Sequence, residues 1–349
     1  MSSSDPQKQV HVHAKKETIP ARRAQAPPQP PAPRRSTRST PQAQPQPQPK
    51  PKVKPFDGLK IFYDPEKRNL VANLDLVFVH GLNGDHIKTW ADEDTGVVWP
   101  RDLIPQTMPN ARVLSFGYNA DIYDNPSVAF IRGYARTLLN LLVDMRSEIV
   151  GVRPIVLVAH SLGGLVVKQA LRLARNETPF RGIAVATRGI LLFSTPHHGA
   201  DEDRWARIAE GFSPLAPGRS TSSHGTTKDQ SADRSPLVEA LKVFSRDVQD
   251  ISEDFRFLAG SYALFSFYET DVWPGTRAPI VSKDSALLNL PHEDQVPLAA
   301  NHVEMVRFDG LEDSKFMQVE KRIQRAAKGL PSVASTRLDM KQRGLVSAK

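Results

Sequence analysis

The chain has 349 residues, 40% of them hydrophobic, which is enough for one large domain or two small ones. It has no cysteine, which excludes disulfides and thiolate metal sites, and no apolar run approaches the roughly 20 residues that a membrane-spanning helix needs. The formal net charge is +8, but residues 1–55 hold 11 Lys and Arg against 2 Asp and Glu, which leaves the remainder near neutral, at about −1. A nearly neutral remainder does not support a basic domain that binds nucleic acid.

Residues 1–55 form a basic segment rich in proline and glutamine, with runs such as "PQAQPQPQPKPKVKP". Such a composition has almost nothing to bury, so it predicts a disordered tail. Its charge is either simply solvated or available for peripheral contact with an anionic membrane, and its protein partners stay unknown. No apolar core of a secretory signal is present. The segment is rich in arginine and poor in acids, as transit peptides are, but its prolines would break an amphipathic helix. Because neither targeting signal is clear, the sequence predicts an intracellular, cytoplasmic protein.

After Phe56, apolar runs with strand and helix periodicity alternate along the chain. This alternation predicts an α/β fold, with a mainly parallel sheet and helices on both faces. We expect the ordered domain to span residues 56–329, with a flexible polar insertion loop at 213–236 and a disordered C-terminal tail at 330–349. Strands are predicted at 74–81, 111–118, 154–159, 188–196, 262–269, 279–282 and 295–300, and helices at 127–150, 164–174, 237–258 and 311–327.

The stretch "IVLVAHSLGGLVVKQAL" places Ser161 between a buried strand and a helix. This is the context of a nucleophile elbow, a tight turn whose neighbours two positions before and after the serine must be small. Here they are Ala159, where the motif usually has glycine, and Gly163. Ser161 also lies at a helix N-terminus, which favours a developing negative charge. Ser161 is therefore the predicted nucleophile.

An earlier strand ends in "VFVHGLNGD", with His80 and Gly81 at its carboxyl end. Acyl transfer needs donors aimed at the oxyanion, usually the N–H after the nucleophile and one from this earlier loop. We expect the backbone N–H groups of Leu162 and Leu82 to be those donors, with His80 and Gly81 in the cleft. The alternative is a plain glycine turn in which His80 only shapes the loop.

A serine nucleophile needs a base, and the order serine, acid, histidine places that base after the last strand. His302 in "LAANHVEMVRF" fits, whereas His197 and His198 in "FSTPHHGA" come too early and are expected to wall the cleft. His160 neighbours the serine, but its side chain is expected to project elsewhere. The acid should end a strand between the two. Glu269 is preferred because it directly ends "YALFSFYE", and Asp271 is the alternative. Asp294 is a more distant third candidate for the acid.

Several motifs together carry a family resemblance: "VFVHGLNGDHIKTW", "WPRDLIP", "SFGYNA", "VAHSLGGLVVKQAL", "LLFSTPHHGA", "FYET" and "ANHVEMVRF". They resemble the lipase-like α/β-hydrolases of the serine-active-site-containing protein group, related to GPI inositol-deacylase-like hydrolases. The resemblance covers about residues 56–328. It implies an α/β-hydrolase fold, a triad of Ser161, Glu269 and His302, and ester or lipid substrates. It also implies association with mitochondria or the endoplasmic reticulum.

These observations predict a serine esterase that works through an acyl-enzyme, without a metal or an organic cofactor. Two features depart from the family pattern: Ala159 and the long polar loop at 213–236. The rival hypothesis is a hydrolase-fold module that has lost turnover and serves in signalling or protein interaction, because a fold does not fix a function.

Overall fold

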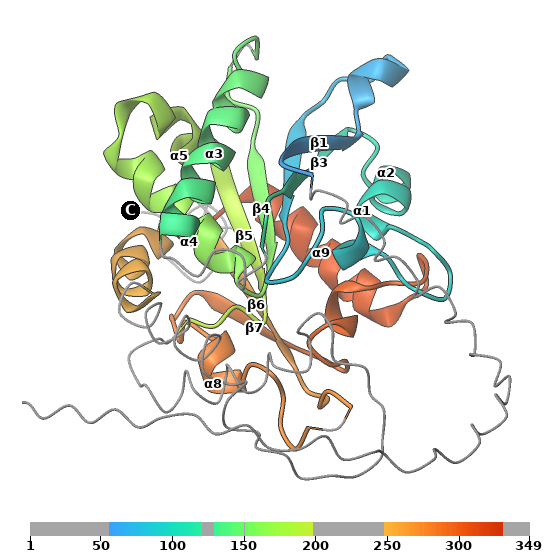
Figure 1. Cartoon of the computed structure of the whole chain (residues 1–349). Coiled ribbons are helices and arrows are strands. Elements are labelled where there is room, and N and C mark those ends of the chain that lie inside the picture. The colour runs from blue at the N-terminus through green and yellow to red at the C-terminus, as the bar shows by residue number, and fades with distance from the viewer. Residues whose placement is uncertain (1–55, 121–128, 150, 198–247, 275, 331–349) are drawn as a thin grey trace, which may run out of the picture. The chain divides into compact units, whose positions relative to one another are not determined.

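The computed structural model describes residues 56–120, 129–149, 151–197, 248–274 and 276–330 (Figure 1). The predicted N-terminal tail, the predicted loop at 213–236 and nearly all of the predicted C-terminal tail lie outside these residues. The predicted domain boundaries therefore stay predictions.

The described residues form a seven-stranded sheet in the order β1-β3-β2-β4-β5-β6-β7. Strand β1 is antiparallel to β3, and every other neighbouring pair is parallel. All residues of β2, β3 and β4 are buried, as expected for parallel strands that are covered on both faces. The strands are β1 (Gly58–Tyr63), β2 (Leu74–Val79), β3 (Ala111–Gly117), β4 (Ile155–His160), β5 (Thr187–Phe193), β6 (Ala263–Glu269) and β7 (Glu293–Leu298).

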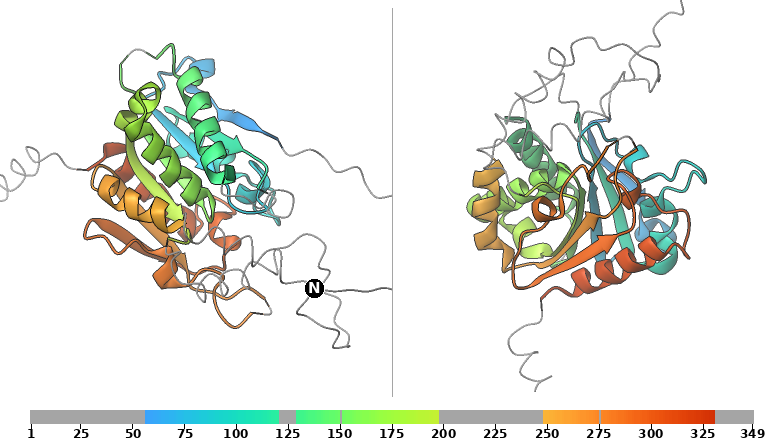
Figure 2. Two further views of the ribbon diagram at one scale, coloured as in Figure 1. Left: turned by 60° about the vertical axis from the view of Figure 1, so that its left-hand side comes forward. Right: turned by 90° about the horizontal axis from the view of Figure 1, so that it is seen from below.

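Helices cover both faces of this sheet (Figures 1 and 2). One core cluster joins one sheet face to α3, α4, α5 and the helical residues 248–259, and a second joins the other face to α1, α2 and α9. The α-helices are α1 (Trp99–Asp102), α2 (Ile104–Thr107), α3 (Ala129–Met145), α4 (Gly163–Asn176), α5 (Arg181–Ala186), α8 (Lys283–Ala286) and α9 (Ser314–Lys328). Short 3₁₀ turns span Pro65–Arg68, Lys88–Trp90, Thr178–Phe180 and Glu304–Val306.

The predicted α/β architecture is confirmed, with two differences among its strands; the short helices α1, α2, α5 and α8 were not predicted either. Strand β1 was not predicted, and it makes one edge of the sheet antiparallel. The predicted strand at 279–282 is wrong, since these residues have no strand structure. Their apolar side chains Ile280 and Val281 are buried, but their N–H groups donate to the side chain of Glu269 and not to a neighbouring strand.

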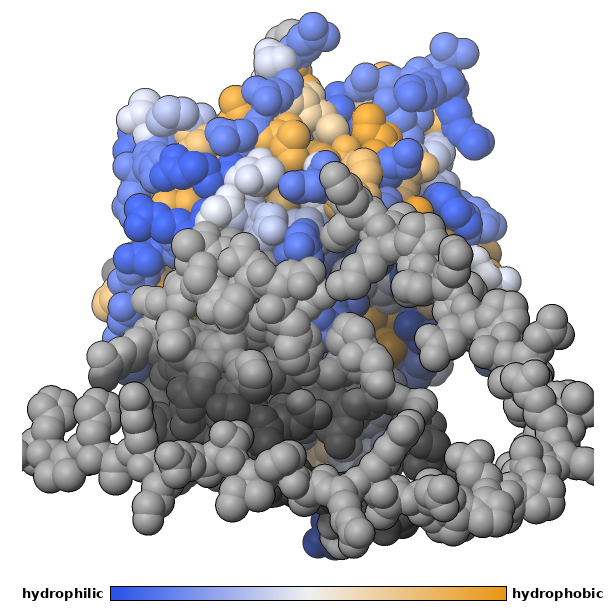
Figure 3. Space-filling view, in the orientation of Figure 1, coloured by the Kyte–Doolittle hydropathy of each residue, from blue (hydrophilic) through white to orange (hydrophobic). Residues whose placement is uncertain are grey.

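The surface of the described part is mixed in character. Hydrophobic and hydrophilic residues lie interspersed on the part of the face that is coloured in Figure 3. No helix among the described residues combines the length and the apolar character that crossing a bilayer requires. The parallel strands β2, β4, β5, β6 and β7 end at one common edge, and this edge carries the site described next.

Candidate active site

Ser161 stands at the turn from β4 into α4 with a backbone φ of 54°, a left-handed conformation that is costly for a residue with a side chain. The turn is held in place because the Ser161 N–H donates to the carbonyl of Phe193 on β5, at 2.8 Å. The side chain is buried, and its Oγ has no hydrogen-bond partner among the described residues. This is the geometry of a nucleophile elbow with an unengaged hydroxyl.

Two glycines let the loop after β2 approach this turn closely. A Cβ added at Gly163 would lie 2.3 Å from the carbonyl oxygen of His80 and 2.5 Å from that of Val79. A Cβ added at Gly81 would lie 2.6 Å from the Cβ of Ser161. Backbone therefore contacts backbone at this point, and only glycine fits.

The close approach brings two backbone donors to the same end of the sheet as Ser161. Among the described residues, neither the Leu82 N–H nor the Leu162 N–H donates a hydrogen bond. Leu162 directly follows the serine at the start of α4, and Leu82 lines the pocket in front of it. An oxyanion needs backbone N–H donors of this kind beside the serine, so the two groups stay candidates for that role.

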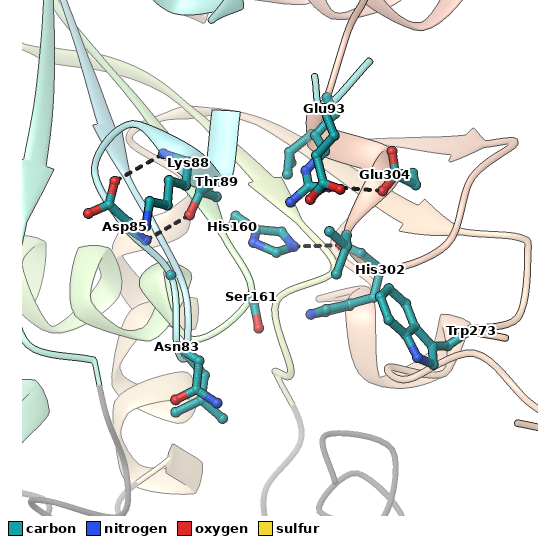
Figure 4. Close-up of a pocket in the computed structure, with 15 residues that line it drawn as sticks. Asn83, Asp85, Lys88, Thr89, Glu93, His160, Ser161, Trp273, His302 and Glu304 are labelled. Carbon is teal, nitrogen blue, oxygen red and sulfur yellow. Dashed lines mark hydrogen bonds and ion pairs between the residues drawn. The ribbon is translucent and has the colours of Figure 1, made fainter. Parts of the chain in front are cut away.

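His302 and Glu269 are brought together at the ends of β7 and β6. His302 Nδ1 lies 2.8 Å from Glu269 Oε1, and both side chains are at most 1% exposed. With Nδ1 engaged by the carboxylate, the other ring nitrogen is the one that can exchange a proton. Figure 4 shows a ring nitrogen of His302 pointing toward Ser161.

Glu269 makes three further hydrogen bonds, two through its carboxylate and one through its backbone N–H. Its Oε1 accepts the N–H of Val281 at 2.9 Å, and its Oε2 accepts the N–H of Ile280 at 3.2 Å. The Glu269 N–H donates to Ser194 Oγ at 3.2 Å. A buried carboxylate needs such partners, and here they also fix the direction from which it meets the imidazole.

The two alternative acids lie away from His302. Asp271 is exposed; its Oδ1 accepts the hydroxyl of Thr270, and its N–H donates to the carbonyl of Ala300. Asp294 lies near the beginning of β7 and pairs with Arg325 at 2.6 Å. The structure therefore places only Glu269, among these three carboxylates, against the histidine.

The residues predicted to wall the cleft need a correction. His80 and Gly81 are buried and are not among the described residues that line the pocket. Gly84 of the following loop packs on both: its N–H donates to the Gly81 carbonyl at 3.1 Å, and a Cβ added to it would lie 2.8 Å from His80 Nδ1. His80 instead stacks on Tyr118, with ring centroids 4.3 Å apart, and its Nδ1 lies 3.0 Å from the carbonyl of Gly81. His197 is also buried and not among the lining residues, and its N–H donates to the carbonyl of Ser285. His198 lies outside the described residues.

Ser161 and His302 line a pocket of about 350 Å³ (Figure 4). Its apolar lining is Leu82, Trp273, Val303 and Val306, and its charged lining is Asp85, Lys88, Glu93, Glu304 and Arg307. Arg307 binds two of these acids, Glu93 at 2.8 Å and Glu304 at 3.1 Å. The pocket thus offers a reacting serine both apolar and charged walls. Among the described residues, no group of His, Asp or Glu is arranged to hold a metal ion.

His160 is a site residue that the sequence reasoning missed. Its side chain was expected to project elsewhere, but it lines the pocket and its Nε2 lies 2.8 Å from the backbone carbonyl of His302. The only sequence signal was its position next to Ser161. A side chain at the end of a strand can turn to either side, so this position alone did not settle the matter.

Comparison with known proteins agrees with this geometry. The profile of the alpha/beta hydrolase family matches residues 76–322, which is most of the chain. The chain belongs to the alpha/beta hydrolase family.

Within this family, the chain is similar to proteins named SERAC1. It is 28% identical to the Bos taurus protein over 280 residues, or 73% of this chain and 39% of that protein. It is 33% identical to the Danio rerio protein over 162 residues, or 41% of this chain and 25% of that protein. The chain therefore spans well under half the length of the curated relatives that it matches.

Solved hydrolase structures are also similar. A carboxylesterase of Nitrososphaera gargenis shares 11% identity at a TM-score of 0.43, over 77% of this chain and 94% of that one. A lipase-esterase related protein of Clostridium acetobutylicum shares 12% identity at a TM-score of 0.41, over 77% of this chain and 98% of that one. The family membership rests on the profile, and the coarse function that follows from it is that of a hydrolase.

Proposed function

We propose that this protein is a serine hydrolase that cleaves carboxylic esters by a triad of Ser161, Glu269 and His302. The observation that carries the proposal is the buried contact of 2.8 Å between His302 Nδ1 and Glu269 Oε1, beside a serine in a strained turn. The contact orients the imidazole and prepares it to gain a positive charge, as the triad mechanism requires.

The proposed reaction begins when His302 Nε2 takes the proton of Ser161 Oγ, which attacks the carbonyl carbon of the ester. The carbonyl oxygen becomes an oxyanion and accepts the N–H groups of Leu82 and Leu162. His302 then gives its proton to the leaving alcohol, and an acyl-enzyme remains on Ser161. Water, deprotonated by His302, attacks this ester, and the acid product leaves with Ser161 reprotonated.

Lipid-like esters are the substrate class that we favour. The support is the resemblance to lipase-like hydrolases, together with apolar pocket walls such as Leu82, Trp273 and Val306. Peripheral contact with a membrane, through the basic residues 1–55, would bring such a substrate to the pocket. Association with mitochondria or the endoplasmic reticulum belongs to the same proposal, and nucleic acid is not a proposed partner.

Replacement of the nucleophile tests the mechanism. Ser161→Ala should leave the melting temperature nearly unchanged, because it removes one hydroxyl that has no hydrogen-bond partner in the described part of the chain. Hydrolysis of p-nitrophenyl esters should fall by about 10⁴-fold, as in other triad knockouts. A matched control is Ser147→Ala, whose exposed hydroxyl bonds only the carbonyl of Asp144. Near-normal turnover by Ser161→Ala would overturn the mechanism.

The rival function, an interaction module without turnover, predicts a different result. A fluorophosphonate probe reacts with an activated serine and leaves an inert one unlabelled. We expect the wild-type protein to be labelled and Ser161→Ala not to be. Absence of labelling in the folded wild-type protein would favour the module. A series of esters of increasing acyl length then tests the lipid-like substrate.

A further inference from the structure

His160, the last residue of β4, contacts the predicted base from the strand that carries the nucleophile. Its Nε2 lies 2.8 Å from the backbone carbonyl oxygen of His302, so the ring N–H donates to that carbonyl. The two rings lie with their centroids 4.8 Å apart at an angle of 44°. His160 itself is 7% exposed. This hydrogen bond joins positions that are 142 residues apart in the chain.

The other contacts described for the backbone near His302 hold mainly the residues that follow it. His302 follows the end of β7 and enters a turn in which Asn301 Oδ1 accepts the N–H groups of Val303 and Glu304. Further along, the indole of Trp99 donates to the carbonyl of Val306 at 2.9 Å. Both sets of contacts hold the turn on the side that follows His302. Among the hydrogen bonds of the described residues, the bond from His160 ties the His302 carbonyl to the strand under Ser161.

We propose that His160 is a positioning residue for His302: by donating to the His302 carbonyl, it fixes the distance and direction between the base and Ser161. This inference rests on the proposed function. In this proposal, His160 sets the geometry of proton transfer between Ser161 and His302. It does so without touching the reacting atoms itself. Misplacement of a reacting group by about 1 Å is enough to cost roughly 100-fold in rate.

The charge of His160 fits this role. Burial is the main cause that holds the pKa of His160 well below its usual value. The nearby His302, and then His80 and Arg307, lower this pKa further. A neutral imidazole with its proton on Nε2 is the form that donates to the carbonyl. A neutral ring also avoids repelling the imidazolium that His302 becomes during the reaction.

Two kinds of substitution separate the hydrogen bond from the bulk of the side chain. His160→Gln keeps a donor, because the amide nitrogen of glutamine occupies about the place of Nε2. His160→Phe keeps an aromatic ring and loses the donor, and His160→Leu is a second donor-free variant. The matched control is His292, whose Nε2 lies 3.0 Å from the carbonyl of Ala259 away from the pocket. His292→Phe should leave kcat unchanged.

We expect His160→Phe to lower kcat roughly 10–100-fold with KM within about threefold, and His160→Gln to restore kcat to within about fivefold of the wild type. Fluorophosphonate labelling should slow in parallel. Wild-type kcat in His160→Phe, or equal losses in the Phe and Gln variants, would overturn the proposal. If only His160→Gln folds, the donor serves folding and the positioning role is likewise overturned. Failure of the wild-type protein to be labelled would instead overturn the proposed function itself.

Discussion

At the scale of single residues, Glu269 and Asp271 carry the same chemical group in opposite surroundings. Glu269 is 2% exposed and accepts hydrogen bonds from His302, Ile280 and Val281. Asp271, two residues on, is exposed, and among the described residues it bonds Thr270 in its own loop and the backbone carbonyl of Ala300. Burial and orientation therefore decide which of the two can serve His302.

Substitution of each acid by its amide tests this difference. Glu269→Gln should lower kcat by roughly 10²–10⁴-fold, because the amide presents the wrong partner to His302 Nδ1 and cannot stabilise the imidazolium. Asp271→Asn should cost less than about tenfold, since its side chain does not reach the pocket. Steady-state kinetics on both variants make the comparison, and a crippled Asp271→Asn beside a normal Glu269→Gln would reverse the assignment.

The sequence indicated the residues of the candidate site better than their orientations. Ser161, Glu269 and His302 could be proposed together because strand ends in a parallel sheet meet at one edge, and strand ends can be read from apolar runs. The direction of a side chain depends on neighbours that are distant in sequence. For this reason, His80 was expected in the cleft and lies beneath the loop, and His160 was expected elsewhere and reaches His302.

At the scale of elements, the packing of α4 against the end of β2 depends on Gly163. A methyl group there would meet the backbone carbonyls of Val79 and His80 at 2.3–2.5 Å, and backbone cannot rotate away as a side chain can. Gly163→Ala should therefore lower both the melting temperature and the turnover. Gly133 in α3 is the control, because a methyl group there meets nothing within 4 Å.

Gly133→Ala should leave turnover unchanged and stabilise the protein by about 0.4–1 kcal/mol, the gain expected when alanine replaces glycine at a compatible helical position. Urea unfolding of both variants measures the difference. Equal stability of Gly163→Ala and the wild type would mean that the elbow relaxes easily, and that the close approach is not a constraint on the fold.

The elements that the sequence missed share a physical reason. Strand β1 (Gly58–Tyr63) is an edge strand with exposed residues, so it lacks the continuous apolar run that reveals a central strand. The segment 279–282 has such a run, but there the N–H groups of Ile280 and Val281 are taken by Glu269. An apolar run indicates that a segment is buried. It does not distinguish a strand from a buried loop whose N–H groups bind a side chain.

At the scale of the whole molecule, the charge is concentrated in one segment. Residues 1–55 carry a net charge of +9 and little that is apolar. Deletion of residues 1–54 should leave the melting temperature and the turnover of a water-soluble ester unchanged, because so polar a segment has little to bury against the domain. Binding to anionic vesicles should weaken on deletion and on addition of salt. A large loss of stability in the deleted protein would show that the segment packs on the domain.

The pH dependence of stability is the second property of the whole molecule, and His80 contributes a definable part of it. Burial lowers the pKa of His80 from 6.5 to about 4, although the hydrogen bond of its Nδ1 with the Gly81 carbonyl and the nearby Asp85 act in the opposite direction. Between these two pH values, the unfolded chain binds a proton at His80 and the folded chain does not. The free energy of unfolding therefore decreases as the pH falls from 6.5 to about 4, by about 3 kcal/mol for this group at most.

His80→Asn isolates this contribution, because asparagine keeps a donor near the position of Nδ1 and cannot be protonated. Its absolute stability will be lower, so the readout is the slope of the unfolding free energy against pH. Urea unfolding at several pH values between 4 and 7 should give a shallower slope for His80→Asn than for the wild type. The other titrating groups are present in both proteins, but His160 and Asp85 sense the charge of His80, so the difference in slope reports His80 together with its coupling to these two groups. Parallel slopes would mean that His80 takes up its proton in the folded state as readily as in the unfolded chain.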